Sequence, residues 1–332
     1  MKYKVLGRTG VLVSELCFGT MTFGSEADEA ESARMFNKCR DAGINFFDCA
    51  NSYSEGKSEQ MLGKFIQGCR DEVVIITKVS QRVGKDVNAV GSSRRQIMSS
   101  LEKSLVRLQT DRVDLYMIHH FDPLTPIDET LRALDDLVRQ GKVLYLGVSN
   151  WAAWQIAKAL GISEKNGLAR FECIEPMYNL VKRQAEVELF PLAVSEKLGI
   201  IPYNPLGAGL LSGKYSKDLK PSEGRFAEKK MYPVRYSNPQ YYETAGLFTD
   251  LARKLGVNPV TLAISWVKSH PAVSAPIIGA RNTSQLEASL AAADFEMSSE
   301  MYEQITKLSK SPGTATDRLE EELDSKYKLR NR

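Results

Sequence analysis

Short apolar runs alternate with stretches of helical periodicity along most of this chain. Eight runs are rich in Val, Ile, Phe and Tyr and are mostly apolar on both faces, which is typical of buried parallel strands. They span residues 16–20, 45–49, 73–79, 113–119, 144–149, 173–178, 200–205 and 275–279. The stretches between them place apolar residues at helical spacing, as Ile97, Leu101, Leu105 and Leu108 show. Parallel strands need such crossovers, so the alternation predicts an α/β fold.

Eight strand–helix units of similar size predict a (β/α)8 TIM barrel. An open doubly wound sheet is the alternative. The even units and the lack of a composition break favour the barrel, in one domain over residues 1–332. Three segments fall outside the minimal barrel. Residues 2–14 are predicted as a β-hairpin turning at residues 8–10, residues 207–241 as a long loop after the seventh strand, and residues 311–332 as a charged tail, exposed and helical or partly disordered.

Composition excludes several classes of partner. The chain has 44 basic and 41 acidic residues and a net charge of +3, so we expect no nucleic acid and no membrane surface as partner. No apolar run is long enough to span a membrane, and the N-terminus lacks a secretory signal. The 5 cysteines have no C-x-x-C spacing, which favours reduced thiols and a cytoplasmic location. The 3 histidines lack zinc-binding spacing, so we expect no metal.

Polar side chains follow three consecutive predicted strands. Asp48 and then Tyr53 follow the second strand, Lys78 ends the third, and His119 and His120 end the fourth. In a barrel these strand ends meet at one face, where active sites lie. A lysine ammonium is expected to lower the pKa of the tyrosine, Asp48 to hold the lysine, and a neutral histidine to orient a carbonyl oxygen. Strand alternation places only one of the two histidines inward, and the pattern alone leaves open which one.

The end of the eighth strand indicates an anion site. Gly279, Ala280 and Arg281 lead directly into a predicted helix, whose N-terminal N–H groups favour a phosphate. A solvated arginine beside an ordinary helix cap is the alternative. A glycine-rich stretch at 207–213 is similar to a dinucleotide fingerprint, but its last glycine comes one residue late and enters a loop, so it is not one.

These motifs resemble the aldo-keto reductases over nearly the whole chain. FDCANSY, ITK, DLYMIHH, LGVSNW, PYNPLGAGLLSGKY and PIIGARN occur in the order of the family. The resemblance is to the branch shared by bacterial and plant reductases and the β subunits of potassium channels. It implies a catalytic tetrad of Asp48, Tyr53, Lys78 and His119, and it selects His119 over His120 because the family histidine follows DLY-x-x directly.

The resemblance also implies NADPH/NADP⁺ bound in extended form without a Rossmann domain. Ser149, Asn150 and residue 175 correspond to contacts of the nicotinamide carboxamide, Tyr203 to the aromatic stacked on the ring, and Arg281 to the 2′-phosphate contact. The remaining cofactor-binding positions that it implies are Thr20, Met21, Asp48, Asn204, Leu206, Gly209, Lys214, Arg225, Gly279, Gln285 and Ser289.

Three residues depart from the family pattern. Glu175 stands where the family usually has Gln, and an ionised Glu cannot donate to a carboxamide. We therefore expect weakened or altered cofactor binding relative to Gln, with an altered environment for the oxidised nicotinamide. Ser289 replaces a usual Asn at the adenine, and Asn204 replaces a usual Ser.

The sequence leaves two candidate functions. The first is NADPH-dependent reduction of aldehydes or ketones, with Tyr53 as general acid; the second is a regulatory or redox-sensing subunit that binds NADPH on the same fold. His119 favours the enzyme, because channel β subunits typically have Asn there. We expect a small-molecule carbonyl substrate, with aromatic or medium aliphatic aldehydes favoured. Its pocket is predicted at Met21, Phe23, Tyr53, His119 and Phe121. The oligomeric state is open.

Overall fold

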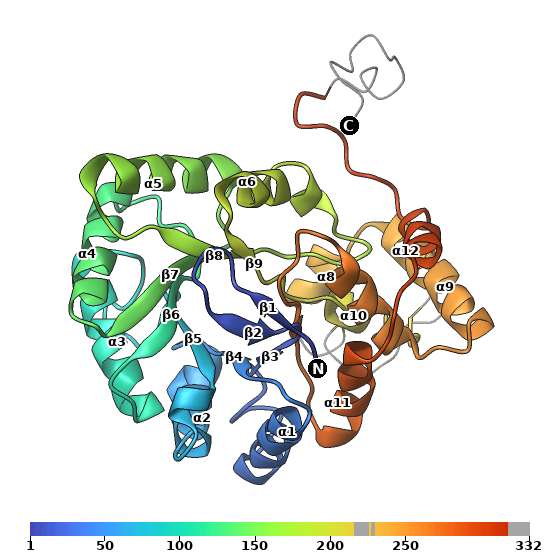
Figure 1. The fold of residues 1–332 in the computed structure, drawn as a ribbon, viewed down its shortest axis with the longest axis horizontal. Coiled ribbons are helices and arrows are strands. Elements are labelled where there is room, and N and C mark those ends of the chain that lie inside the picture. The colour runs from blue at the N-terminus through green and yellow to red at the C-terminus, as the bar shows by residue number, and fades with distance from the viewer. Residues whose placement is uncertain (216–225, 227–229, 318–332) are drawn as a thin grey trace.

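The chain folds into a ring of parallel strands surrounded by helices (Figure 1). The computed structural model describes residues 1–215, 226 and 230–317. Each strand pairs in parallel with its neighbour in the order β10-β3-β4-β5-β6-β7-β8-β9. The strands are β3 (Cys17–Gly19), β4 (Phe46–Asp48), β5 (Val74–Val79), β6 (Val113–Ile118), β7 (Val143–Ser149), β8 (Phe171–Glu175), β9 (Gly199–Ile200) and β10 (Ile277–Ile278).

Backbone hydrogen bonds between the chain around β9 and the chain around β10 close the ring. The Ser274 N–H donates to the Ile200 carbonyl at 2.8 Å, and the Ile277 N–H donates to the Pro202 carbonyl at 2.9 Å. The segment before β10 therefore lies against the segment after β9. The predicted (β/α)8 barrel is confirmed, although the runs at 200–205 and 275–279 contribute only two strand residues each.

Helices cover the outside of the ring, as the crossovers of a parallel sheet require. Between the strands lie α1 (Glu29–Asp41), η1 (Tyr53–Gly56), α2 (Lys57–Phe65), η2 (Arg70–Glu72), α3 (Arg94–Leu108), α4 (Ile127–Arg139), α5 (Ala153–Asn166), η3 (Gln184–Glu186) and α6 (Leu189–Glu196). After β9 come η4 (Gly207–Gly209), α8 (Met231–Arg235), α9 (Pro239–Lys254), α10 (Pro259–Ser269), α11 (Thr283–Leu290), η5 (Ala291–Ala293) and α12 (Ser299–Thr306). Among the helices that the structure describes, none is both long and apolar enough to cross a membrane.

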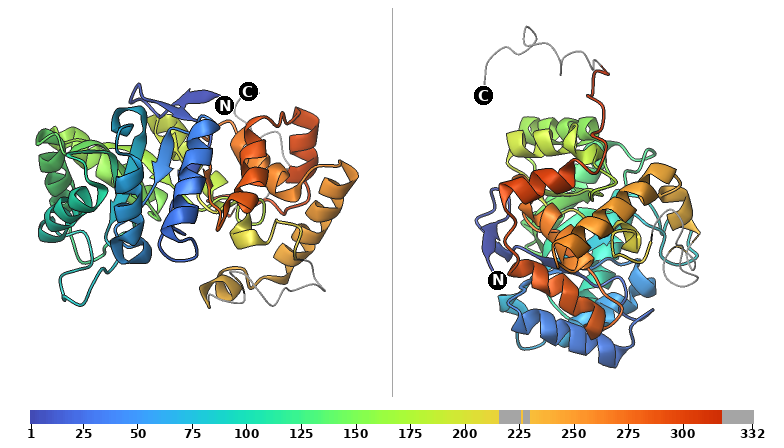
Figure 2. Two further views of the ribbon diagram at one scale, coloured as in Figure 1. Left: turned by 90° about the horizontal axis from the view of Figure 1, so that it is seen from below. Right: turned by 90° about the vertical axis from the view of Figure 1, so that its right-hand side faces the viewer.

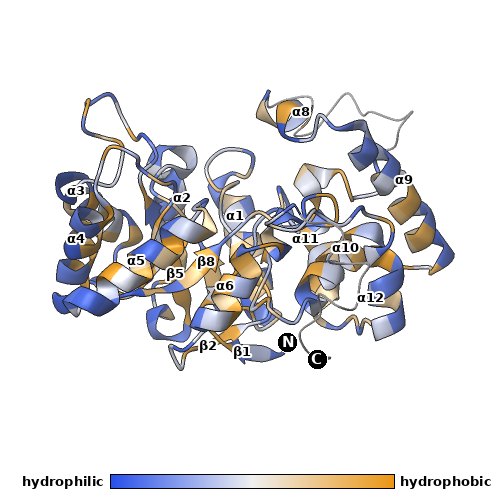
Figure 3. Ribbon diagram, turned by 90° about the horizontal axis from the view of Figure 1, so that it is seen from above, coloured by the Kyte–Doolittle hydropathy of each residue, from blue (hydrophilic) through white to orange (hydrophobic). Residues whose placement is uncertain are grey.

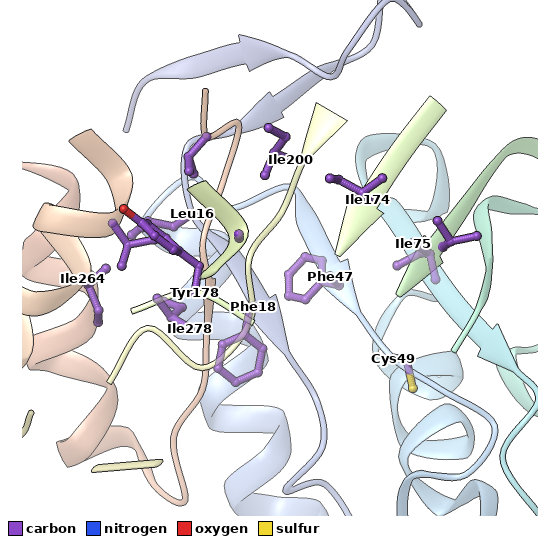
Figure 4. Close-up of a cluster of buried hydrophobic side chains, with 14 of the residues drawn as sticks. Leu16, Phe18, Phe47, Cys49, Ile75, Ile174, Tyr178, Ile200, Ile264 and Ile278 are labelled. Atoms are coloured by element: carbon purple, nitrogen blue, oxygen red, sulfur yellow. The ribbon is translucent and has the colours of Figure 1, made fainter. Parts of the chain in front are cut away.

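Apolar residues fill two separate layers. The larger cluster packs between the strands and the helices, where Phe18, Phe47, Ile75 and Ile174 lie (Figure 4). The smaller cluster fills the interior of the barrel. The outward faces of α3 and α4 are largely hydrophilic (Figure 3). The alternate residues of each strand therefore supply one layer or the other, which explains why the strand runs are apolar on both faces.

The predicted N-terminal hairpin is present and lies across one end of the barrel (Figure 2). Strands β1 (Tyr3–Val5) and β2 (Leu12–Ser14) pair antiparallel. Leu6 is fully buried and belongs to the interior cluster. Helix α8 lies at the opposite end (Figures 2 and 3). The hairpin therefore covers one end, and the carboxyl ends of the strands lie at the other.

A long connection follows β9, as predicted, and its described residues contain helical elements: η4 and α8 lie within 207–241, and α9 begins there at Pro239. Residues 216–225 and 227–229 lie outside the described part of the chain. The Asn238 side chain accepts a hydrogen bond from the Gln240 N–H, and Pro239 occupies the first turn. Both are ordinary helix-start features, so the sequence contained a signal for this helix. Of the predicted tail, residues 311–317 form neither helix nor strand, and residues 318–332 lie outside the described part of the chain.

Candidate active site

Four polar side chains extend the interior faces of four strands. Each follows an interior apolar residue by two positions: Asp48 follows Phe46, Lys78 follows Ile76, His119 follows Met117, and Glu175 follows Cys173. Alternate residues of a strand face the same side of the sheet. All four therefore point into the barrel at the carboxyl end of their strands, above the interior apolar cluster.

Lys78 lies at the centre of this group and is fully buried. Its Nζ donates a hydrogen bond to Asp48 Oδ1 and another to the Cys49 carbonyl at 3.2 Å. Glu175 Oε2 lies 3.3 Å from the same nitrogen, and Tyr53 Oη lies 3.4 Å from it. One ammonium group therefore contacts two buried carboxyl groups and a partly buried phenol.

A strained turn places Tyr53 over the lysine. Ser54, Glu55 and Gly56 have φ values of 50°, 57° and 91°, so three consecutive residues are left-handed. Only glycine adopts this conformation without cost, and a Cβ at Gly56 would also meet the Arg107 side chain at 2.8 Å. Ser54 Oγ donates to the Phe23 carbonyl at 2.9 Å and anchors the turn. Such strain typically occurs at functional sites.

The pKa of Tyr53 differs from the sequence-based expectation. Burial raises this pKa well above its ordinary value; Lys78 opposes the shift, while Asp48 and Glu175 add to it. The expected net lowering by the lysine is therefore wrong for this structure. The two carboxylates offset the lysine, and the phenol keeps its proton at neutral pH. Tyr53 is thus available as a proton donor.

His119 is a buried, neutral imidazole. Burial, then Lys78, then His120 lower its pKa well below the usual value. Its ring meets the Tyr53 ring edge-on at 5.9 Å, and its Nδ1 is buried without a hydrogen-bond partner. His120 is exposed, stacks on His119 at 5.1 Å and contacts Gln81. The structure therefore places His119 inward and His120 outward.

Two carboxylates compete for one lysine. Asp48 makes the closer contact with Lys78. Burial and the neighbouring Asp48 raise the pKa of Glu175 to about 8, against the pull of Lys78. Glu175 Oε2 has no hydrogen-bond partner. Its carboxyl group therefore carries a proton at neutral pH, whereas Asp48 remains the counterion of the lysine.

A hydrogen-bonded group of neutral side chains lies beside Glu175. Ser149 Oγ donates to the Glu175 carbonyl at 2.9 Å, and the Asn150 amide donates to Ser149 Oγ at 2.9 Å and to the His119 carbonyl at 3.0 Å. The Tyr203 hydroxyl donates to Asn150 Oδ1 at 2.7 Å. Asn150, Glu175 and Tyr203 also line a pocket of about 320 Å³. The structure therefore brings these predicted cofactor residues together.

The predicted contacts after β9 follow a tight turn. Asn204 has a φ of 64°, and its Oδ1 accepts from the Ala208 N–H at 2.6 Å. Its amide donates to the Tyr236 hydroxyl at 2.7 Å. Leu206 and Gly209 lie in the same turn, and Lys214 is exposed beyond it. Arg225 lies outside the described residues.

The predicted phosphate site is formed in part. Gly279 is exposed, and Arg281 precedes α11. However, several N–H groups there already have partners within the chain. The Thr283 N–H donates to Glu31, whose pKa is lowered by this contact, and the Arg281 N–H donates to Gln285 Oε1 at 3.2 Å. Anion binding at this end therefore depends more on the Arg281 side chain than on the helix N-terminus. Ser289 is buried, and its contact with adenine stays a prediction.

Two predictions at the pocket mouth need correction. Phe23 is fully buried between Phe18 and Phe65, with ring centroids 5.8 and 5.9 Å away, so it packs the core and lines no pocket. Thr20 is also buried, and its hydroxyl donates to the Asp48 carbonyl at 3.0 Å, which holds the end of β4 in place. Met21 remains 38 % exposed beside them.

Phe121 meets two tryptophans that sequence analysis missed. Its ring lies edge-on to Trp151 at 5.0 Å and to Trp154 at 6.4 Å. Trp154 is 62 % exposed. A tryptophan directly after Ser149–Asn150 was the available signal. Tyr236 was also missed; it is buried and anchors Asn204.

The polar groups fit a nicotinamide dinucleotide. His119 Nδ1 is buried without a hydrogen bond, and Glu175 Oε2 is buried with the Lys78 ammonium at 3.3 Å but no hydrogen bond, so each has bonding capacity left for a bound molecule. Ser149 and Asn150 supply amide and hydroxyl groups near Glu175, and Arg281 supplies a cation at the far end of the strand ring.

Comparison with known proteins identifies relatives over nearly the whole length. A sequence model described as "Aldo/keto reductase family" matches residues 15–310. The uncharacterized oxidoreductase YrpG of Bacillus subtilis is 38 % identical over 95 % of this chain and 98 % of its own. A probable voltage-gated potassium channel subunit beta of Arabidopsis thaliana is 37 % identical over 89 % and 92 %. Versiconal hemiacetal acetate reductase of Aspergillus parasiticus is 30 % identical over 90 % and 94 %.

Proposed function

The chain belongs to the aldo/keto reductase family, and we propose that it is an NADPH-dependent reductase that converts aldehydes or ketones to alcohols. The observation that carries the proposal is the position of the Tyr53 hydroxyl, 3.4 Å from a fully buried lysine and beside a neutral His119. Oxidoreductase names among the relatives support the same class of reaction.

The chain's own residues supply the acid side of the reaction. When bound, the reduced nicotinamide supplies the hydride for the carbonyl carbon. Tyr53 donates its hydroxyl proton to the carbonyl oxygen, and Lys78 stabilises the phenolate that remains. Asp48 keeps Lys78 charged and oriented. An N–H of the neutral His119 donates to the same oxygen and holds it in place.

Several residues would hold the dinucleotide. Ser149, Asn150 and Glu175 would contact the carboxamide, and Tyr203 would contact the ring. Arg281 and Gln285 would contact the adenosine end, and Asn204, Leu206, Gly209 and Lys214 would contact the part of the dinucleotide between the adenosine and the nicotinamide.

A cytoplasmic location is also proposed, because the number of cysteines is odd and their spacing is not that of disulfides.

A second function has support from the names of three relatives. The resemblance to a probable potassium channel β subunit, at 37 % identity, favours an NADPH-binding regulatory or redox-sensing subunit. The reductase remains the better proposal, because this chain has both the lysine-bound Tyr53 and the inward His119.

One experiment separates the two functions. NADPH oxidation is followed with a panel of aromatic and aliphatic aldehydes and ketones, and NADPH binding is measured on the same protein. Turnover on any carbonyl class supports the reductase. Binding without turnover across the panel favours the regulatory function, and absence of NADPH binding contradicts both.

We expect Arg281→Ala to reduce the preference for NADPH over NADH by about 10- to 100-fold, because a charged hydrogen bond to phosphate is worth about 1.5–3 kcal/mol. The measurement is KM for each cofactor with one carbonyl substrate. Arg253→Ala is the matched control, since Arg253 is an exposed arginine on α9 that pairs with Asp250. An equal loss for NADH and NADPH would contradict the assignment of Arg281 to the 2′-phosphate.

A further inference from the structure

Glu175 makes a contact that the proposed proton transfer does not use. Its carboxylate is the second one on Lys78, at 3.3 Å, while Asp48 already forms the closer pair. The side chain is 4 % exposed, and its Oε2 has no hydrogen-bond partner. The Lys78 ammonium beside it is already neutralised by Asp48, so a second buried carboxylate is costly when it is ionised. This geometry favours a protonated Glu175 unless a second positive charge lies beside it.

Titratable groups from several strands surround Glu175. The titratable groups are Lys78, Asp48, Tyr53, Cys17, Cys173 and Tyr203. Burial raises the pKa of both thiols and both phenols, so these four groups are neutral between pH 6 and 9. Lys78 and Asp48 cancel. The buried group is therefore neutral with Glu175 protonated, and it carries one negative charge with Glu175 ionised.

We propose that Glu175 sets the relative affinity of this site for the two oxidation states of its dinucleotide, keeping its proton beside the reduced ring and releasing it beside the positively charged oxidised ring. This inference rests on the proposed function. Binding of NADP⁺ to the protonated site yields the carboxylate–NADP⁺ complex and one free proton. Binding of NADPH, whose ring is uncharged, releases none at this group.

The nicotinamide ring must lie close enough to Glu175 for the charge of its carboxylate to affect binding. The carbonyl oxygen must reach Tyr53 Oη, and only the Lys78 ammonium separates that hydroxyl from Glu175. A hydride donor must in turn contact the carbonyl carbon. Glu175 Oε2 and Tyr53 Oη lie 3.3 and 3.4 Å from the same Lys78 nitrogen, so a ring that serves a carbonyl at Tyr53 lies within a few ångströms of the Glu175 carboxyl group. In a buried site two opposite charges interact much more strongly than in water.

The ionisation of Glu175 determines how the ratio of Kd for NADP⁺ to Kd for NADPH changes with pH. Burial and Asp48 raise the pKa of Glu175 to about 8, so the free site is mostly protonated at pH 6 and mostly ionised at pH 9. The ionised form attracts the oxidised ring. The ratio of Kd for NADP⁺ to Kd for NADPH should therefore fall as pH rises, by about tenfold for each unit by which the oxidised ring lowers this pKa.

The test measures Kd for NADPH and NADP⁺ by tryptophan fluorescence between pH 6 and 9. Both ligands carry the same 2′-phosphate, so its ionisation cancels in the ratio. Wild type should show a fall of about tenfold or more across this range. Glu175→Gln, which is isosteric and always neutral, should give a flat ratio near the wild-type value at pH 6. Glu172→Gln is the control: Glu172 is on the same strand at its other end, with a pKa also raised by burial.

Proton counting provides a second measurement that needs no variant. Calorimetry in two buffers of different ionisation enthalpy should show proton release when wild type binds NADP⁺ near pH 7, beyond any release with NADPH. A flat ratio in wild type, the same slope in Glu175→Gln, or equal proton release with both ligands would overturn the inference while both cofactors still bind. Failure to bind either cofactor would instead overturn the proposed function.

Discussion

Tyr53→Phe is expected to lose about 10²–10⁴-fold in kcat for carbonyl reduction, because it removes the hydroxyl proposed to protonate the carbonyl oxygen. The change deletes a hydroxyl whose partner is Lys78 at 3.4 Å. The ring contacts with His119 and with the Lys78 ammonium do not need that hydroxyl. Cofactor affinity and fold should therefore stay unchanged, and the measurement is kcat together with Kd for NADPH.

Tyr116→Phe supplies the matched control for this prediction. Tyr116 is fully buried on β6, and its hydroxyl donates to the Ile97 carbonyl at 3.2 Å, on the helix side of the strand. Its loss should cost about 1 kcal/mol of stability and leave kcat unaltered. A Tyr53→Phe enzyme that keeps more than half of the wild-type kcat would contradict the assignment of Tyr53 as the acid.

The architecture and the tetrad were predictable for the same reason. Strands buried on both faces indicate a covered parallel sheet, and parallel strands end at one edge. Asp48, Lys78 and His119 stand at the ends of consecutive strands, so their proximity follows from chain order alone. Period-two alternation then directs them inward, two residues beyond Phe46, Ile76 and Met117.

Contacts across the barrel were not predictable in this way. Lys78 is on β5 and Glu175 is on β8, and no sequence spacing relates two strands that are not neighbours. The contact between them depends on the barrel radius and on side-chain length. The raised pKa of Tyr53 was missed for a related reason, because it depends on how completely the site excludes water.

The sequence also did not show which individual aromatic residues are buried. Phe23 and Phe121 both follow strand ends in polar surroundings, and the sequence treats them alike. The structure buries Phe23 between two other phenylalanines and leaves Phe121 half-buried against Trp151. The Phe23 N–H donates to the Thr20 carbonyl at 3.0 Å, and this turn after β3 is local geometry that the sequence pattern did not show.

The lysine at the centre of the site also controls stability. Lys78→Met is expected to lower the free energy of unfolding by about 3–5 kcal/mol, since removing one partner leaves buried charge without compensation. Asp48 and Glu175 would both remain, with their pKa values raised further. An acid whose pKa is higher in the folded state than in the unfolded state loses stability as pH rises through the folded value. The loss should therefore be larger at pH 8 than at pH 5, as measured by urea unfolding.

Two further variants make the stability prediction specific. Asp48→Asn combined with Lys78→Met removes one of the stranded charges, so it should recover part of the loss at pH 8. Lys268→Met is the control: Lys268 is 10 % exposed, pairs with one carboxylate, Glu15, at 3.2 Å, and donates to the Ala293 carbonyl at 3.2 Å. Its substitution leaves one carboxylate unpaired instead of two, so its cost should be smaller. Lys78→Met within about 1 kcal/mol of wild type at pH 8 would mean that water reaches both carboxylates, against the penalty expected for an unpaired buried charge. The same result would remove the physical basis for a raised pKa at Glu175 and for the release of a proton to solvent when NADP⁺ binds.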